Sequence, residues 1–381
     1  MFSINETHRF FAPQLDVPPR LLLGPGPSNA HPRVLQAIAM PQIGHLDPAF
    51  IQVMNDIQEM LRYAWQTDNA FTLPVSGTGS AAMEAAMANL VEPGDVVLVG
   101  VIGYFGERLV EMASRYGADV RRLDKAWGEV FTLDEIRQGV ETHRPALLAL
   151  VHAETSTGAL QPMAGVGDLC RAHDCLLLID TVTSLGTTPI FLDEWGVDAA
   201  YSCSQKGLSC PPGASPFTLG ERALAKLHGR RTKVANWYLD MSILSQYWDG
   251  KTRSYHHTAP INSMYAVREG LRLVVEEGLA ERWARHQANA ERLWDGLTEL
   301  DLACHVNDPA HRIPALITVR VPAGIDARDT AVRLLNDYNI EIAGGFGPLA
   351  GKVWRIGLMG HNSRPENVTL LLAALKEILG R

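Results

Sequence analysis

Two residues near the middle of the chain have the types and spacing needed for covalent chemistry on an amine or a carbonyl group. Asp180 ends the apolar run Leu176-Leu177-Leu178-Ile179, which is typical of a buried strand. Lys206 follows 26 positions later, after the small polar stretch Ser202-Cys203-Ser204-Gln205. Because ligands bind at the carboxyl ends of strands in open α/β sheets, we expect both side chains to face one crevice.

An Asp–Lys pair in such a crevice suits pyridoxal 5′-phosphate. The lysine amine can form a Schiff base with the cofactor aldehyde, and the carboxylate keeps the pyridine nitrogen protonated, so that the ring accepts electrons. Burial favours the neutral, nucleophilic form of the amine. Taken singly, each residue has a plainer interpretation: Asp180 ends a strand and Lys206 is an exposed lysine.

A glycine-rich loop offers a place for a phosphate. Ser76-Gly77-Thr78-Gly79-Ser80 lies between an expected strand, 71–75, and an expected helix, 80–90. Backbone N–H groups in such a loop can converge on an anion, and the helix N-terminus adds positive potential. The loop matches neither the Walker pattern nor a complete G-x-G-x-x-G. A glycine-rich turn that binds nothing is the alternative.

The elements that must position these residues alternate between strand and helix. The pattern predicts strands at 71–75, 95–99, 120–123, 146–151 and 176–179, and helices at 80–90 and 105–115. Asp47-Pro48 predicts a helix start, and Thr132 with Glu135 predicts a capping box. Short apolar strands alternating with helices indicate an α/β fold with a mainly parallel sheet.

The pattern changes in the second half of the chain. A mostly helical stretch from 261 to 300 precedes the order strand (315–321), helix (327–336), strand (341–343), strand (353–358), helix (365–379). Ser363 and Glu366 predict a second capping box. We therefore expect an N-terminal arm (1–23), a large α/β domain (24–260), a connecting helical region (261–300) and a small C-terminal α+β domain (301–381).

The composition limits the binding partners and the cellular compartment that we expect for this protein. Lys and Arg number 34 against 42 Asp and Glu, a net charge of −8, which argues against general binding to nucleic acid or anionic membranes. No apolar run approaches the ~18 residues of a membrane span. Neither a secretory signal nor a peroxisomal Ser-Lys-Leu end is visible, so we expect a cytoplasmic protein. The five cysteines form no C-x-x-C pair and are expected to be reduced, buried thiols.

Seven segments in order along the chain resemble the class V aminotransferases of fold type I, most closely the alanine–glyoxylate and serine–glyoxylate (serine–pyruvate) branch. This family depends on pyridoxal phosphate. The resemblance implies a large domain with a seven-stranded, mainly parallel mixed sheet between helices, and a small C-terminal domain. The segments are Leu22-Leu23-Gly24-Pro25-Gly26-Pro27-Ser28, Ser76–Ser80, Glu154-Thr155-Ser156-Thr157-Gly158, Ile179-Asp180, Ser204-Gln205-Lys206, Tyr255-His256-His257-Thr258 and Arg355-Ile356-Gly357.

The resemblance implies roles around the cofactor. Lys206 would hold the cofactor and carry the proton, and Asp180 would pair with the ring nitrogen. Thr155 would bond the ring hydroxyl, and Phe105 would stack on the ring where close relatives often have tryptophan. The phosphate would be surrounded by Thr78, Gly79, Ser80 and Gln205, with Ser80 replacing a histidine of some relatives.

Further roles concern substrate and subunits. Arg355 would grip the substrate carboxylate with its planar fork, helped by backbone near Gly26, whereas a solvated surface arginine is the alternative. Tyr255 and Thr258 would reach the phosphate of a neighbouring subunit, which implies a homodimer with shared sites; a polar loop is the alternative. We expect no metal at His256-His257, because adjacent side chains diverge.

The resemblance predicts transfer of an amino group from a small amino acid, alanine or serine, to a 2-oxo acid such as glyoxylate, with ping-pong kinetics. Serine–pyruvate or aminoethylphosphonate transamination is an alternative. A cysteine desulfurase is disfavoured, since Gln205 rather than histidine precedes Lys206 and Cys304 lies outside any expected catalytic loop. A non-catalytic binding protein is disfavoured because it has no need for Lys206, Asp180 and Arg355 together.

Overall fold

The fold was obtained as a computed structural model, which describes residues 4–248 and 253–381. Its largest sheet has seven strands in the order β2-β10-β9-β8-β5-β3-β4. Only β10 runs antiparallel to its neighbours, so the sheet is mixed and mainly parallel, as predicted. The strands are β2 (Phe71–Gly77), β3 (Val96–Val101), β4 (Asp119–Asp124), β5 (Leu147–Val151), β8 (Leu176–Asp180), β9 (Ala199–Tyr201) and β10 (Gly213–Leu219).

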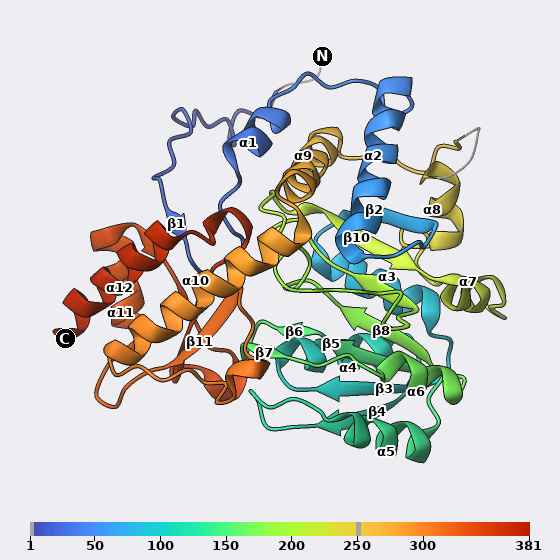
Figure 1. Cartoon of the computed structure of the whole chain (residues 1–381). Helices are drawn as coiled ribbons and strands as arrows, with labels where there is room; N and C mark the ends of the chain where they lie inside the picture. Colours follow the sequence, from blue (N-terminus) through green and yellow to red (C-terminus); the bar gives the residue numbers. More distant parts are fainter. Residues whose placement is uncertain (1–3, 249–252) are drawn as a thin grey trace.

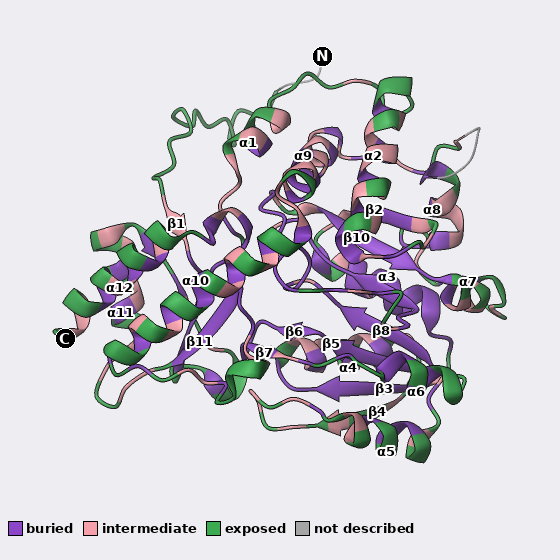
Figure 2. Ribbon diagram, in the orientation of Figure 1, coloured by how far each residue is buried: buried purple, intermediate pink, exposed green. Residues whose placement is uncertain are grey.

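Helices cover this sheet because its central strands are apolar on both faces, whereas the edge strand β4 is polar and mostly exposed. Every residue of β5 and β8 is buried, which accounts for their continuous runs of aliphatic residues. In Figure 2 the central strands of the sheet are buried and the outer faces of the helices are exposed. The helices of this part are α1 (Pro32–Ile38), α2 (Pro48–Trp65), α3 (Gly79–Leu90), α4 (Tyr104–Arg115), α5 (Leu133–His143), α6 (Val166–Ala172), α7 (Glu221–His228) and α8 (Met241–Trp248).

Local sequence signals set several of the helix boundaries. Asp47 caps α2 by accepting a hydrogen bond from the N–H of Ala49, and Pro48 opens that helix. The apolar positions Phe50 and Met54 lie on its buried face. Thr132 and Glu135 form both hydrogen bonds of a capping box at the start of α5. These boundaries confirm the sequence-based expectation for both helices.

A second group of elements packs beside the large sheet. The long helices α9 (Ile261–Glu277) and α10 (Leu279–Glu299) lead into it (Figure 1). There β14 lies between β11 and β13, and a separate apolar cluster includes Leu293, Val319, Trp354 and Leu371. The elements are β11 (Leu316–Arg320), α11 (Ala327–Tyr338), β12 (Ile340–Glu341), β13 (Ala343–Gly344), β14 (Val353–Gly357) and α12 (Pro365–Leu379).

Three short strands complete the structure. β1 (Leu21–Leu22) pairs in parallel with β12, so the end of the N-terminal segment joins the C-terminal group of elements. The preceding residues 4–19 are exposed and form no helix or strand. β6 (Ala153–Glu154) and β7 (Ala159–Leu160) form a small antiparallel pair. No helix in the described part of the chain has the length and apolar character needed to cross a membrane.

Two local expectations were wrong. The strand expected at 341–343 is split: β12 pairs with β1, whereas β13 pairs with β14, because the chain turns from one sheet to the other at Ile342. The capping box of α12 does not form. The N-cap is Arg364, without a side-chain hydrogen bond. Ser363 is buried instead, where its Oγ accepts a hydrogen bond from Asn289 Nδ2 at 3.2 Å.

Candidate active site

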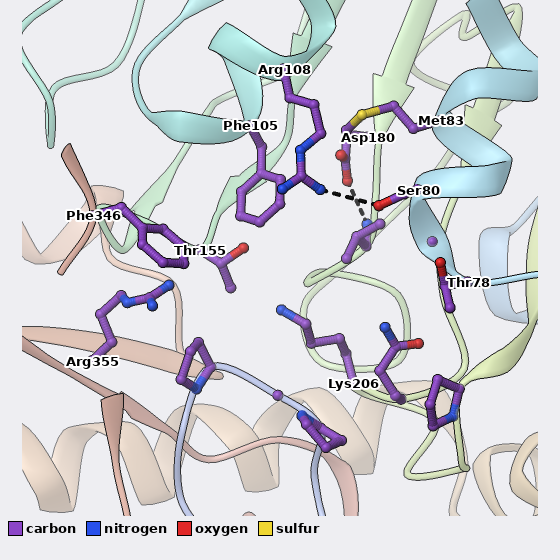
Figure 3. Close-up of a pocket in the computed structure, with 17 residues that line it drawn as sticks. Thr78, Ser80, Met83, Phe105, Arg108, Thr155, Asp180, Lys206, Phe346 and Arg355 are labelled. Atoms are coloured by element: carbon purple, nitrogen blue, oxygen red, sulfur yellow. Dashed lines mark hydrogen bonds between the residues drawn. The ribbon is translucent and has the colours of Figure 1, made fainter. Parts of the chain in front are cut away.

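A cavity of about 320 Å³ lies where the carboxyl ends of the large sheet's parallel strands meet the C-terminal elements (Figure 3). Asp180 ends β8, Thr78 follows β2, and Lys206 lies on the loop after β9. These three residues, far apart in sequence, therefore lie together at the edge of the sheet where its parallel strands end. Ten of the residues singled out from the sequence line this cavity. They are Gly26, Thr78, Gly79, Ser80, Phe105, Thr155, Asp180, Gln205, Lys206 and Arg355.

Asp180 is held in one orientation by two hydrogen bonds. Its Oδ1 accepts from the N–H of Val182 and its Oδ2 from the hydroxyl of Tyr201, each at 2.8 Å. Burial raises the pKa of Asp180 to about 6, against the lowering effect of these bonds. A cationic group placed against this carboxyl would therefore favour its ionised form.

Lys206 is buried, with 7% of its surface exposed. Burial lowers the pKa of its amine, because the charged form loses its hydration. The loop that carries it is fixed through its backbone: Ser28 Oγ donates to the carbonyl of Lys206 at 2.9 Å, and Arg282 Nη2 donates to that of Gly207 at 2.6 Å. The backbone of the lysine loop is therefore held at the cavity, and burial favours the neutral form of the amine, which is the form able to act as a nucleophile.

Gly26 allows the chain to pass close to the lysine side chain. Its φ is +114°, and a Cβ atom there would lie 2.7 Å from both Cδ and Cε of Lys206. Such distances are far below van der Waals contact, so any larger residue would displace the lysine. The Gly24-Pro25-Gly26-Pro27 turn therefore forms one wall of the cavity beside the amine.

The helix α3 begins at the end of the cavity that lies opposite Arg355. Thr78 is its N-cap but makes no side-chain capping bond, and Gly79 and Ser80 are its first residues. The first N–H groups of a helix lack intrahelical partners and attract anions. Gln205 also lines the cavity, and the N–H groups of its side-chain amide can donate to an anion. Open N–H groups are what a phosphate ester needs, so this end fits the phosphate of pyridoxal phosphate.

A buried carboxylate fixes the backbone at Phe105. Glu154 Oε2 accepts from the N–H groups of Phe105 and Gly106 at 3.0 and 3.3 Å, and Oε1 accepts from the hydroxyl and N–H of Ser156. Burial raises the pKa of Glu154, while the bonds from Ser156 oppose that change. Thr155 is also buried, and its Oγ1 accepts from Thr183 Oγ1 at 3.3 Å. These contacts orient the start of α4 toward the cavity.

Arg355 points into the cavity from β14, on the far side from Thr78 (Figure 3). Its Nε donates to the carbonyl of Gly344 at 2.7 Å, and its Cζ lies 4.0 Å from the centre of the Phe346 ring. Burial lowers its pKa to about 10. Within the described residues no carboxylate lies within ion-pair distance of this guanidinium, which leaves its fork available to a carboxylate ligand.

Tyr255 and Thr258 do not line this cavity. Both are exposed, Tyr255 by 63%. The neighbouring histidines correct one expectation: the rings of His256 and His257 do not diverge, and their Nδ1 atoms lie 2.8 Å apart. This segment is neither strand nor helix, and Trp237 stacks on His256 at 4.5 Å. Among the described residues no group of three or more metal-ligating side chains is gathered at one point.

Sequence reasoning missed several residues of the cavity wall. Arg108 is the most polar of them and Phe346 is the largest. Tyr201 was also missed; it does not line the cavity but donates a hydrogen bond to Asp180. Arg108 follows Phe105 by one helical turn, and Phe346 lies among Gly344, Gly345 and Gly347; both signals are visible in the sequence but not specific. The other missed residues are Pro25, Pro27, Met83, Val182 and Pro212.

Comparison with known proteins agrees with this geometry. The class V aminotransferase family matches residues 21–368. The alanine–glyoxylate aminotransferase of Oryctolagus cuniculus is 48% identical over 96% of this chain and 94% of its own length. The (S)-ureidoglycine–glyoxylate transaminase of Bacillus subtilis is 40% identical over 97% and 92%. The crystal structure of alanine–glyoxylate aminotransferase from Nostoc sp. superposes with a TM-score of 0.98, at 64% identity, over 99% of this chain and 100% of that one.

The matched region contains every cavity-lining residue described above, and the fold is that of the family's solved structures. The chain belongs to the class V aminotransferases, the pyridoxal phosphate-dependent transaminases of fold type I.

Proposed function

We propose that this transaminase moves the amino group of alanine to glyoxylate. One observation carries the proposal: a single cavity holds a buried lysine amine, a buried carboxyl and an arginine without a carboxylate partner in the described structure. The names of its relatives from Oryctolagus cuniculus and Nostoc sp. support this choice of substrates. Serine is the second donor that we propose.

Different residues of the cavity would bind different groups of the cofactor. Bound pyridoxal phosphate supplies an aldehyde for the lysine amine and a ring that withdraws electrons. In our proposal Lys206 holds the aldehyde carbon and Asp180 the ring nitrogen. Thr155 bonds the ring hydroxyl, and Phe105 covers one ring face. The phosphate lies against Thr78, Gly79, Ser80 and Gln205.

Lys206 also moves the proton. Because burial lowers the pKa of its amine, the neutral form is favoured, and Nζ would accept the proton from the Cα atom of the substrate and deliver it to the C4′ carbon of the cofactor. The bonds from Ser28 and Arg282 to backbone carbonyls hold the lysine loop in place at the cavity. Asp180 stays ionised opposite the positive ring nitrogen.

Arg355 binds the carboxylate of donor and acceptor in turn. Its fork suits a bidentate grip, and backbone near Gly26 completes the site. Since one arginine serves both substrates, the first product must leave before the acceptor binds, which predicts ping-pong kinetics. Phe346 lines the cavity over the guanidinium, with its ring 5.0 Å from that of Tyr104, and we propose that Phe346 limits the space for a donor side chain.

We propose a homodimer in which Tyr255 and Thr258 reach the partner's phosphate site. Their exposure and their distance from the chain's own cavity support this arrangement. We propose that the arm, 1–23, precedes a cofactor domain, 24–260, a connecting region, 261–300, and a small domain, 301–381; the separate apolar cluster among the C-terminal elements supports the small domain. Five free thiols are consistent with the cytoplasmic location that we propose. We propose neither nucleic acid nor a membrane as a partner.

The test is a substrate matrix with the purified holoenzyme. Alanine, serine, (S)-ureidoglycine, aminoethylphosphonate and cysteine are each paired with glyoxylate and pyruvate, and kcat/KM is measured for every pair. Ureidoglycine is included because of the Bacillus subtilis relative. We expect alanine with glyoxylate to rank first and Lys206→Ala to abolish turnover. A higher kcat/KM for another donor, or sulfide release from cysteine, would overturn the substrate assignment, and near-normal turnover of Lys206→Ala would overturn the mechanism.

A further inference from the structure

Arg108 lines the cavity between Phe105 and the start of α3. Its Nη1 donates a hydrogen bond to Ser80 Oγ at 3.1 Å, shown as a dashed line in Figure 3. Its Cζ lies 4.9 Å from the centre of the Phe105 ring and 5.3 Å from that of Tyr104. The guanidinium therefore touches both the aromatic wall and the helix N-terminus that suits a phosphate.

The charge of Arg108 is not balanced by an acidic side chain in the described structure, although acidic residues are close in sequence. Glu107, its immediate neighbour, pairs with Arg122 at 2.8 Å on the outside of the helix. Arg115, two turns further along α4, pairs with Glu111 at 2.8 Å. Among the described residues, the partners of Arg108 are the neutral Ser80 hydroxyl and two aromatic rings, so its positive charge faces the cavity without an acidic partner there.

The other basic side chains of the cavity are assigned to other groups of the cofactor and substrate in the proposed function. Among the lining residues described, only Lys206, Arg355 and Arg108 are basic. In the proposed function Lys206 is used at the aldehyde, and Arg355 lies on the far wall, bonded to Gly344. A phosphate monoester carries a charge of about −1.5 to −2 near neutral pH. A helix N-terminus supplies only about half a positive charge.

We propose that Arg108 is the cation that neutralises the phosphate of the cofactor, acting beside Ser80. The inference rests on the proposed function, because it concerns the same cofactor. Serine at position 80 is short enough to let the guanidinium reach the first turn of α3, where its hydroxyl accepts from Nη1. A role limited to orienting Phe105 is the competing explanation, and it would act on the ring rather than on the phosphate.

The experiment compares two ligands on the apoprotein. Pyridoxal phosphate and pyridoxal, which lacks the phosphate, are titrated into wild type, Arg108→Gln and Arg108→Lys, and binding is followed by absorbance and by quenching of tryptophan fluorescence. Arg115→Gln is the matched control, since Arg115 lies on the same helix but pairs with Glu111 away from the cavity. Stabilisation of each apoprotein by inorganic phosphate is measured as a shift in Tm.

We expect Arg108→Gln to weaken binding of pyridoxal phosphate by roughly 10- to 100-fold, while binding of pyridoxal changes less than about twofold. Arg108→Lys should recover part of the loss, and the phosphate-induced rise in Tm should shrink in Arg108→Gln but not in Arg115→Gln. Unchanged affinity for pyridoxal phosphate in Arg108→Gln would overturn the inference. An equal loss for both ligands would also overturn it, in favour of the role on Phe105. A wild-type protein that binds neither ligand would instead overturn the proposed function, and the inference with it.

Discussion

Replacing Asp180 with asparagine should stabilise the apoprotein at neutral pH, although it removes a residue that the reaction needs. Asparagine keeps both hydrogen bonds: its Oδ1 can accept from Val182, and its Nδ2 can donate to the Tyr201 hydroxyl. What it removes is the buried charge. Burial raises the pKa of Asp180 from 3.8 to about 6, which corresponds to about 3 kcal/mol at about 1.4 kcal/mol per pH unit.

The sign follows from proton linkage. An acid whose pKa is higher in the folded state than in the unfolded state costs no stability well below pH 3.8, where both states are protonated. The cost grows as the pH rises and is nearly complete above about pH 6. The difference in unfolding free energy between Asp180→Asn and wild type should therefore be only about 0.5 kcal/mol at pH 4 and approach about 3 kcal/mol at pH 7.5, in favour of the variant.

Urea denaturation of cofactor-free protein from pH 4.5 to 7.5 measures this difference directly. Asp68→Asn is the control, because Asp68 is an exposed residue of a loop beside the same sheet. In the holoenzyme the effect should reverse, since the variant no longer pairs with the ring nitrogen, and turnover should fall. A stability difference that stays constant across this pH range would refute the reasoning that the Asp180 carboxyl is destabilised by burial.

Three further substitutions test the walls of the cavity. Gly26→Ala should lose covalent attachment of the cofactor, measured by absorbance, because its Cβ would lie 2.7 Å from the Lys206 side chain; a normal spectrum would contradict the packing described. Arg355→Lys should raise KM for alanine roughly 10- to 100-fold with a smaller change in kcat, and an unchanged KM would exclude a bidentate grip. Phe346→Ala should raise kcat/KM for larger donors, such as valine, relative to alanine by about tenfold or more, whereas an unchanged ratio would show that Phe346 does not limit donor size.

Much of the fold could be predicted because its signals are local. The buried strands β5 and β8 are continuous apolar runs in the sequence, and the caps of α2 and α5 depend on residues within three positions of one another. The same locality explains the errors. Ser363 has a capping pattern, but burial against Asn289 takes its hydroxyl away from the helix. The segment 341–343 has strand character, but nothing local says that its two ends join different sheets.

The sequence by itself determined the chemical inventory: a lysine and an aspartate at strand ends, a glycine-rich loop before a helix, and an arginine on a late strand. These are properties of residue type and of spacing along one chain. Only the tertiary structure decided which charge state burial favours for these side chains and which of them lack an ion-pair partner among the described residues. Burial lowers the pKa of Lys206, Arg355 lacks a carboxylate partner within the described residues, and Arg108 reaches Ser80 from another helix. Desolvation and charge pairing depend on distances between segments far apart in sequence, which no local pattern encodes.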